Sequence, residues 1–420
     1  MRRLLIRKLA VTAGTAVMLP FLATAASAGT SGQTPTIVPD SSLTPTTVAL
    51  GGAKVLPTTR TVAHWYGTAA NPTDGVTYGF NMVGADPSTN QSTTITTDII
   101  PINVVVGGMT FSGTDVLQPT LNSPLFTNND YTTTPAWTSS AGGFTSGTGA
   151  LSSASTGSQL EDATMRSQFN KGGTNYHVIL NPVVHDAITI DVPANHGTLL
   201  ESVRGVIAPD INVTWWAAQL QNLNNNLGYM DPTHLPLYLT NNVMLYSGTD
   251  PLNCCIIGFH SASEVVGHGL GSTHSSGSAK VQTYAWGSYV TPGFFNPSRD
   301  WALQDIHALS HEISEWADDP FVNNTVQPWL TPTAPQYGCT GVMETGDPVV
   351  GIGFAKGTNT FEQGPTPNGT QVADGYYHPE DEVLMPWFMR LSPSTSETGR
   401  YTFMGNLNPY PGFQVPATGC

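Results

Sequence analysis

The stretch HALSHEISEWADDP, residues 307–320, decides how the rest of the chain is interpreted, because its charged and apolar residues separate at helical spacing. At 100° per residue, with the first histidine at 0°, His311 lies at about 40°, Glu315 at about 80° and Glu312 at about 140°. The apolar residues lie on the other side, between about 180° and 260°: Ile306, Leu309, Ile313 and Trp316. We expect a helix with one buried face and one face that offers ligands to a cation.

The polar face of this helix has the residue types of a metal site. Residues four apart lie on neighbouring turns, close enough to share one divalent ion, and imidazole and carboxylate groups are ordinary zinc ligands. The H-E-x-x-E pattern of residues 311–315 resembles the H-E-x-x-H helix of zinc-dependent peptidases, with glutamate in place of the second histidine. This resemblance implies that His311 and Glu315 bind zinc and that Glu312 polarises the bound water.

Two other interpretations of the helix stay open. His307 and His311 form an alternative i, i+4 pair with Glu315 as third ligand, but Ala308 then stands where the catalytic glutamate would follow the first histidine. The helix face could instead only solvate the protein. Four such residues close together, in a chain of which only 10% is charged, favour a metal.

A zinc site needs a third protein ligand and an open position for water. Glu344 is our first choice, since it lies in a loop, residues 341–348, that glycine and proline bound and that can fold back over the helix. Asp347 is the second choice and His378 the third; the ordinary alternatives are a turn aspartate that bonds its own backbone and a surface histidine before proline. His260, at the end of an expected strand, either faces the site or packs in the core, and we favour the core.

The composition excludes several classes of function. The chain has 420 residues, and its 14 Lys+Arg against 29 Asp+Glu give a net charge of −15, which repels phosphate backbones and excludes nucleic acid as a partner. Neither a G-x-S-x-G elbow nor a G-x-x-x-x-G-K loop occurs, so the usual serine hydrolases and nucleotide-binding proteins lose their support. We expect the acidic run at residues 380–382 to be a solvated turn.

The N-terminus has the pattern of an export signal. Basic residues in the first eight positions precede an apolar run, residues 9–23, and the small residues Ala26-Ser27-Ala28. We therefore expect a signal peptide over residues 1–28, cleaved before Gly29, and a secreted protein without a later membrane span. The Thr/Pro/Ser-rich residues 29–61 contain too few large apolar side chains to fold and are expected to form a flexible tether.

The remaining chain predicts an α+β fold. Between residues 62 and 208 the apolar runs are short and β-branched, which indicates a β-rich region. After residue 209, apolar residues at helical spacing predict a helix ending near Gly228, and the metal-bearing helix is expected from a Ser298 N-cap to about Ala317. The expected strands are residues 94–106, 108–111, 176–184, 235–246, 255–259 and 281–290.

The four cysteines, at positions 254, 255, 339 and 420, would all be exported to an oxidising compartment, so disulfides are expected. Four cysteines allow three pairings, one of which joins the adjacent residues 254 and 255. We favour the bonding of each of these two to Cys339 or Cys420, which would hold Glu344 near the helix.

Several short motifs resemble a known family when they are taken in order: Gly258-Phe259-His260, Tyr284-Ala285-Trp286, His311-Glu312-Ile-Ser-Glu315, Asp319-Pro320 and Glu344-Thr-Gly346-Asp347. They resemble secreted bacterial proteins of unassigned role and, more distantly, the plant EXORDIUM-like, phosphate-induced proteins, over about residues 209–390. The resemblance implies an extracytoplasmic, zincin-like C-terminal region, residues 209–420, with a loop-rich cap. The resemblance implies site roles for His311, Glu312 and Glu315, and for Glu344 only if its loop folds back over the helix. It argues against His307 as a ligand.

These observations predict a secreted metal-dependent hydrolase, a zinc metallopeptidase in which Glu312 is the base and His311, Glu315 and Glu344 hold the ion. Its substrate would be a peptide or a protein. Because the plant proteins are associated with growth signalling, the alternative is a non-enzymatic secreted binding or signalling protein that acts on a cell-surface polymer, with a structural metal or none. A glycan-active enzyme ranks third.

Overall fold

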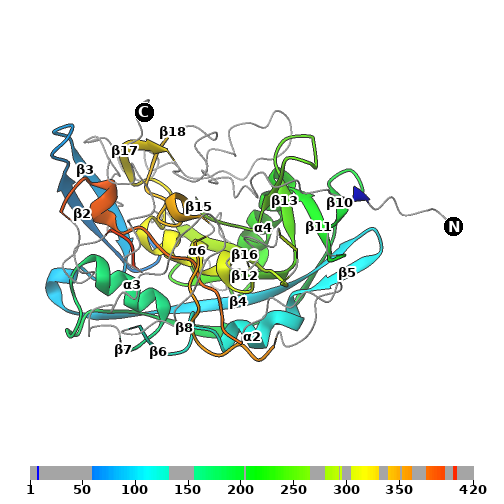
Figure 1. Cartoon of the computed structure of the whole chain (residues 1–420), viewed down its shortest axis with the longest axis horizontal. Coiled ribbons are helices and arrows are strands. Elements are labelled where there is room, and N and C mark those ends of the chain that lie inside the picture. Colours follow the sequence, from blue (N-terminus) through cyan, green and yellow to red (C-terminus); the bar gives the residue numbers. More distant parts are fainter. Residues whose placement is uncertain are drawn as a thin grey trace, which may run out of the picture.

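The computed structural model describes the following residues: 7–8, 59–131, 156–202, 205–264, 280–292, 294–295, 304–330, 339–350, 352–361, 375–392 and 401–403. Helices and strands alternate irregularly along these ranges, and the fold is α+β (Figure 1). The predicted cleavage site and most of the predicted signal peptide and tether lie outside the described residues. None of the described helices is both long and apolar enough to cross a membrane.

A seven-stranded sheet forms the centre of the fold (Figure 1). Five strands follow the order β15, β16, β12, β4 and β5, while β8 and β9 pair with successive parts of the long strand β4. β12 is parallel to both of its neighbours, and β15 is antiparallel to β16. The strands of this sheet are β4 (Ser92–Val106), β5 (Met109–Ser112), β8 (His177–Val184), β9 (Ile188–Asp191), β12 (Leu235–Asn241), β15 (Gly258–Glu264) and β16 (Val281–Tyr289).

Two helices cover opposite faces of the central sheet. Leu237 of β12 belongs to the hydrophobic core that contains the apolar residues of α6 (His307–Asp318). Its neighbour Tyr238 belongs to the core that contains Trp216 of α4 (Val213–Asn226). Because successive side chains of a strand point to opposite faces, every second residue of β12, β15 and β16 faces α6.

The other elements surround this central layer. A second sheet has the strand order β1 (Arg7–Lys8), β10 (Gly197–Glu201), β11 (Ile207–Asn212), β13 (Met244–Tyr246) and β14 (Cys254–Ile256). Three strand pairs complete the β-structure of the described residues: β2 (His64–Ala70) with β3 (Thr77–Val83), β6 (Asn129–Asp130) with β7 (Thr156–Ser158), and β17 (Thr325–Leu330) with β18 (Cys339–Val342). The shorter helices are α2 (Leu117–Leu121), α3 (Leu160–Gln168) and α7 (Met385–Phe388), with 3-10 turns at Pro87–Thr89, Gly113–Val116 and Asp347–Val349.

Most elements expected from hydrophobic periodicity are present, with two corrections. The helix after residue 209 is α4, and each expected strand overlaps an observed one. Helix α6, however, begins at His307, because Asp305 has a left-handed φ of 45° and its backbone pairs with Val290 at the end of β16. The expected N-cap, Ser298, lies outside the described residues. Helix α3 was missed because its sequence, LEDATMRSQ, is polar although all of it is buried.

The expected boundary between residues 208 and 209 does not separate two folded units. It falls inside β11, and β4 from the first region pairs with β12 from the second across five residues of each strand. Both regions therefore contribute to one sheet, because strand pairing joins segments without regard to their separation along the chain.

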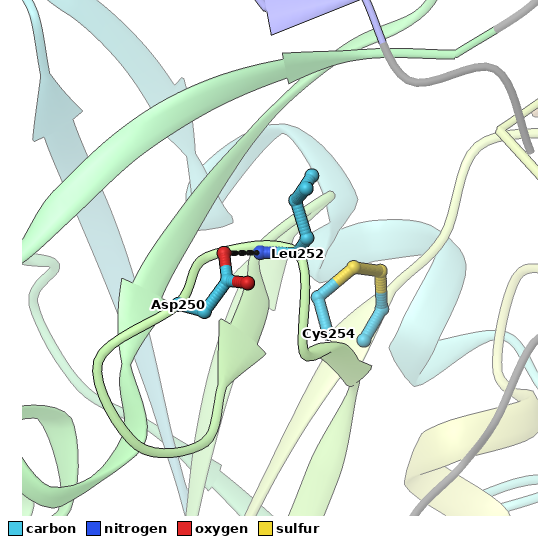
Figure 2. Close-up of a disulfide and its surroundings, with 4 residues drawn as sticks. Asp250, Leu252 and Cys254 are labelled. Atoms are coloured by element: carbon cyan, nitrogen blue, oxygen red, sulfur yellow. Dashed lines mark hydrogen bonds between the residues drawn. A yellow bond between two sulfur atoms is a disulfide. The ribbon is translucent and has the colours of Figure 1, made fainter.

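Cys254 and Cys255 lie in β14, and the structure bonds their sulfur atoms to each other (Figure 2). The preceding turn is held by Asp250, whose carboxylate accepts a hydrogen bond from the Leu252 amide (3.0 Å). The pairing that we favoured, with Cys339 and Cys420, stays a prediction. Cys420 and the side chain of Cys339 lie outside the described residues.

Candidate metal centre

Helix α6 is buried around its whole circumference, including the face expected to offer ligands. His311 and Glu312 each retain 5% of their possible exposure, and Glu315 retains 4%. The apolar side of the helix packs in the core that contains Leu237 of β12 and Ala285 of β16, and two loop segments, around Asp347 and around Glu380, contact the polar side. The ligand face is therefore enclosed by protein.

His311 is the centre of the contacts on this face. Its Nε2 lies 3.1 Å from Oε1 of Glu315 and 3.8 Å from Oδ1 of Asp347. Its Nδ1 lies 2.7 Å from Oε2 of Glu380. Because a carboxylate only accepts hydrogen bonds, Nδ1 carries the proton of this contact, and in the neutral ring Nε2 then presents its lone pair to the other two carboxylates.

Glu380 is completely buried, and the expectation of a solvated acidic turn at residues 380–382 is wrong. Besides His311, its Oε2 lies 2.9 Å from Nε2 of His307, and its backbone amide donates to the hydroxyl of Ser310. The segment is drawn over α6 because the next amide, that of Asp381, donates to the carbonyl of Ile352. The acidic composition of residues 380–382 predicted exposure to solvent, but their contacts with α6 and with Ile352 bury them instead.

The loop that carries Asp347 is fixed to Glu315 through its backbone. The amides of Gly346 and Asp347 donate to Oε1 of Glu315 at 3.2 and 3.3 Å. A side chain at Gly346 would collide with the imidazole of His311, so glycine is needed for the close approach. The sequence Gly346-Asp347-Pro348 thus forms one wall of the site.

His260 enters the site from β15, not the purely apolar core that we favoured for it. It pairs in register with Ala285, which belongs to the same core as α6, so strand alternation directs the imidazole toward the helix. Its Nδ1 lies 3.5 Å from Oε2 of Glu312 and 3.6 Å from Oε2 of Glu315. Its Nε2 lies 3.9 Å from Oε2 of Glu344.

A second glycine allows α6 to approach the sheet. A Cβ atom at Gly258, two residues before His260 on the same strand, would lie 2.5 Å from Oε1 of Glu312. The G-F-H motif of residues 258–260 is therefore explained by its geometry, because the glycine makes room for the glutamate and the histidine contacts it.

The predicted ligands divide between two groups. Ligand atoms of His311, Glu315 and Asp347 all lie within 4.8 Å of one another, and so do those of His260, Glu315 and Glu344. Of the three ligands that we predicted, Glu315 therefore belongs to both groups, whereas His311 belongs to one group and Glu344 to the other.

The remaining candidates have other contacts. His307 contacts Glu380, and His378 lies 2.8 Å from Oδ2 of Asp305 through its Nδ1. Neither histidine belongs to the two ligand groups found among the described residues. The sequence did not predict that His260 and Glu380 belong to the site. Only the G-F-H motif of residues 258–260 pointed to His260, and no motif pointed to Glu380.

Electrostatics couple the histidines and carboxylates of the cluster. Burial lowers the pKa of the His311 imidazole, but the adjacent Glu315 and Glu380 outweigh this effect and raise that pKa well above its usual value. Burial raises the pKa of Glu315, but His311 and His260 outweigh it and hold that pKa well below the usual range. Glu315 is therefore the carboxylate most firmly kept in its anionic form.

The other carboxylates are destabilised as anions. Burial raises the pKa of Glu344, Asp347 and Glu312 above that of an ordinary carboxyl group. Among the described residues, histidines supply every ion pair of the cluster. The site consequently has an excess of acidic groups without lysine or arginine partners in the described ranges.

These residues fit a divalent cation. Both carboxylate oxygens of Glu344 and Oδ2 of Asp347 are buried and accept no hydrogen bond from any described residue. Buried charges require a partner or a metal, and one imidazole with two carboxylates is an ordinary donor set for zinc.

Comparison of the chain with protein-family models, curated proteins and solved structures gave no match. The geometry of the cluster is therefore the basis for inferring function.

Proposed function

We propose that this protein is a secreted, zinc-dependent hydrolase of peptide bonds, with the ion held by His311, Glu315 and Asp347. One observation carries the proposal: His311 Nε2 faces two buried carboxylates while Glu380 holds the other nitrogen of the same ring. Asp347 thereby replaces Glu344 as the third ligand of this ion.

The distances between the donor atoms support a shared ion. Two ligands about 2.1 Å from zinc lie about 3.4 Å apart at a tetrahedral angle. The separations of 3.1 Å to Glu315 and 3.8 Å to Asp347, both measured from His311 Nε2, lie on either side of this value.

Glu380 has the position of a residue that orients a metal ligand. A histidine that binds zinc normally donates its other ring N–H to a carboxylate or carbonyl, which sets the tautomer and raises the basicity of the donor nitrogen. The 2.7 Å contact between His311 Nδ1 and Glu380 Oε2 meets this requirement.

Glu312 is proposed to accept a proton from the attacking water. Zinc supplies Lewis-acid chemistry when bound, lowering the pKa of water and polarising a carbonyl. Glu312 follows His311 on α6, and its Oε2 lies 3.5 Å from the His260 nitrogen that also faces Glu315. Its carboxylate therefore lies beside the proposed ligands, where a general base must be.

Export and a zincin-like C-terminal region belong to the same proposal. The predicted signal peptide supports export. Helix α6 packs on the central sheet, and Glu312 of α6 meets His260 of β15. This meeting of ligand-type residues from a helix and a strand supports a zincin-like arrangement of residues 209–390.

A secreted binding or signalling protein of the EXORDIUM type, with a structural metal, is the second candidate. The burial of the cluster favours it, because exposures of 4–5% leave a substrate little access to His311, Glu312 and Glu315.

Metal analysis combined with a peptidase assay tests the proposal. The purified protein should contain zinc and cleave casein, and Glu315→Gln should lose the zinc. Glu312→Gln should keep the zinc content of the parent and lose at least about a hundredfold in rate, because it removes only the base.

The outcomes separate the two candidates. Absence of zinc from the parent protein would remove the proposed site. Zinc without cleavage of casein would favour the binding protein, and full activity in Glu312→Gln would eliminate Glu312 as the base.

A further inference from the structure

We infer that the cluster holds a second divalent cation beside the first, ligated by His260 and Glu344, with Glu315 as the carboxylate that bridges the two ions. The inference rests on the proposed function, because the first ion is the zinc proposed at His311, Glu315 and Asp347. It extends that function from a one-metal to a two-metal hydrolase.

The two oxygens of Glu315 face different histidines. Oε1 lies 3.1 Å from His311 Nε2, and Oε2 lies 3.6 Å from His260 Nδ1. Each oxygen of this carboxylate thus lies near the nitrogen of a different histidine, as expected of a carboxylate that bridges two metal ions. The amides of Gly346 and Asp347 bond to Oε1 and fix the orientation of this carboxylate.

The second ligand group has unpartnered donors of its own. Glu344 is 1% exposed, and neither of its carboxylate oxygens accepts a hydrogen bond from a described residue; Nε2 of His260, which is 5% exposed, has no hydrogen bond either. Nε2 of His260 lies 3.9 Å from Oε2 of Glu344, below the roughly 4.2 Å that two donors on one ion can span. The 3.6 Å contact with Oε2 of Glu315 is made by the other ring nitrogen, Nδ1, and one ligand atom of each of the three residues lies within 4.8 Å of those of the other two.

The number of acidic groups in the cluster favours more than one cation. Its described carboxylates are Glu312, Glu315, Glu344, Asp347 and Glu380. A single divalent ion at His311 compensates two of them and leaves Glu344 on the far side of Glu315 with only a neutral or protonated imidazole as partner. A second ion at His260 and Glu344 compensates two more carboxylates and so reduces an imbalance that is costly in a buried site.

A two-metal site suits hydrolysis of an uncharged, stable bond such as an amide. Ions about 3.5–4 Å apart stabilise both the attacking and the leaving oxygen or nitrogen of a displacement. Glu312 contacts His260 and follows His311 in sequence, so this one residue adjoins both ligand groups and can serve as base between them.

A protonated His260 could instead act as the only counter-ion of Glu344. Counting zinc separates the two arrangements. Protein that is stripped with a chelator, incubated with Zn²⁺ and passed through gel filtration should retain two zinc ions per chain. Glu344→Gln and His260→Gln should each retain one, Asp347→Asn should retain one, and Glu315→Gln should lose tight binding of both.

Asp210→Asn is the matched control, because Asp210 is also a buried carboxyl group without a described hydrogen-bond partner but lies on β11, outside both ligand groups. It should retain two ions. Circular dichroism identifies any variant that has lost its fold, and the His260 and Glu344 variants report on the same ion independently.

Loading with Mn²⁺ supplies a second readout. Two Mn²⁺ ions bridged by Glu315 should give an exchange-coupled electron paramagnetic resonance spectrum, and Glu344→Gln should give the spectrum of an isolated ion. One zinc in the parent, unchanged in Glu344→Gln and lost in Asp347→Asn, would overturn the second site and leave the proposed function intact. No zinc in the parent would overturn both.

Discussion

Asp210 is a buried carboxyl group outside the metal centre. It lies on β11 between Thr198 of β10 and Met244 of β13, fully buried, and neither carboxylate oxygen has a hydrogen-bond partner among the described residues. Burial raises the pKa of its carboxyl group to about 8. The folded protein therefore keeps this group protonated at a pH where the unfolded chain ionises it.

The pH dependence of stability should reveal Asp210. Its pKa is higher in the folded than in the unfolded state, where it is about 3.9, so its contribution is fully present below about pH 4 and is lost as the pH rises to about 8. Asp210→Asn should therefore be more stable than the parent near pH 8, by up to about 5 kcal/mol, and similar to it near pH 4. Urea unfolding at both pH values measures the difference, and a pH-independent difference would contradict the assigned burial.

At the scale of elements, the metal centre depends on the close approach of a loop to α6. The loop reaches His311 only because Gly346 has no side chain, and its backbone amide bonds to Glu315. The imidazole cannot move away, since Glu380 holds its other nitrogen. The conformation of the loop and the orientation of the ligand are therefore coupled.

Gly346→Ala should weaken zinc binding at least about tenfold and lower the free energy of unfolding of the metal-free protein by about 1–3 kcal/mol, because the added methyl displaces the ring of His311. Gly341→Ala, in the adjacent strand β18, is the matched control, since its Cβ would lie an ordinary 3.6 Å from the Val326 carbonyl. Competition with a chelating dye gives the affinity, and equal losses in both variants would argue against a specific effect at His311.

At the scale of the whole molecule, the central sheet joins the two regions that the sequence separates. β12, which lies under α6, has β16 on one side and β4 on the other. Without β4, one edge of β12 would expose unpaired backbone groups, and the sheet would lose the strand that β5, β8 and β9 all pair with.

A fragment of residues 209–420 should therefore not fold by itself. The cut divides β11 and removes β4 from β12, so we expect a cooperative thermal transition in the full chain and none in the fragment. Far-ultraviolet circular dichroism during heating, together with limited proteolysis, tests this. A sharp transition and a protease-resistant fragment would indicate that the C-terminal region is an independent domain after all.

The sequence by itself determined the features that have a local period. Helical spacing placed His311, Glu312 and Glu315 on one helix, and short apolar runs predicted the strands of the central sheet except β9. Both patterns depend only on residues that are close in sequence, so they can be recognised without knowledge of the fold. The start of α6 was misplaced because Asp305 is held by a tertiary contact with Val290.

Only the tertiary structure decided which distant groups meet. His260, Asp347 and Glu380 come from a strand and two loops far apart in the chain, and their convergence on α6 depends on sheet register, on Gly346 and on backbone hydrogen bonds rather than on spacing. The same contacts bury residues 380–382, which composition alone would leave in water. Periodicity determines how a segment folds, but packing between segments determines which of its side chains share a cation.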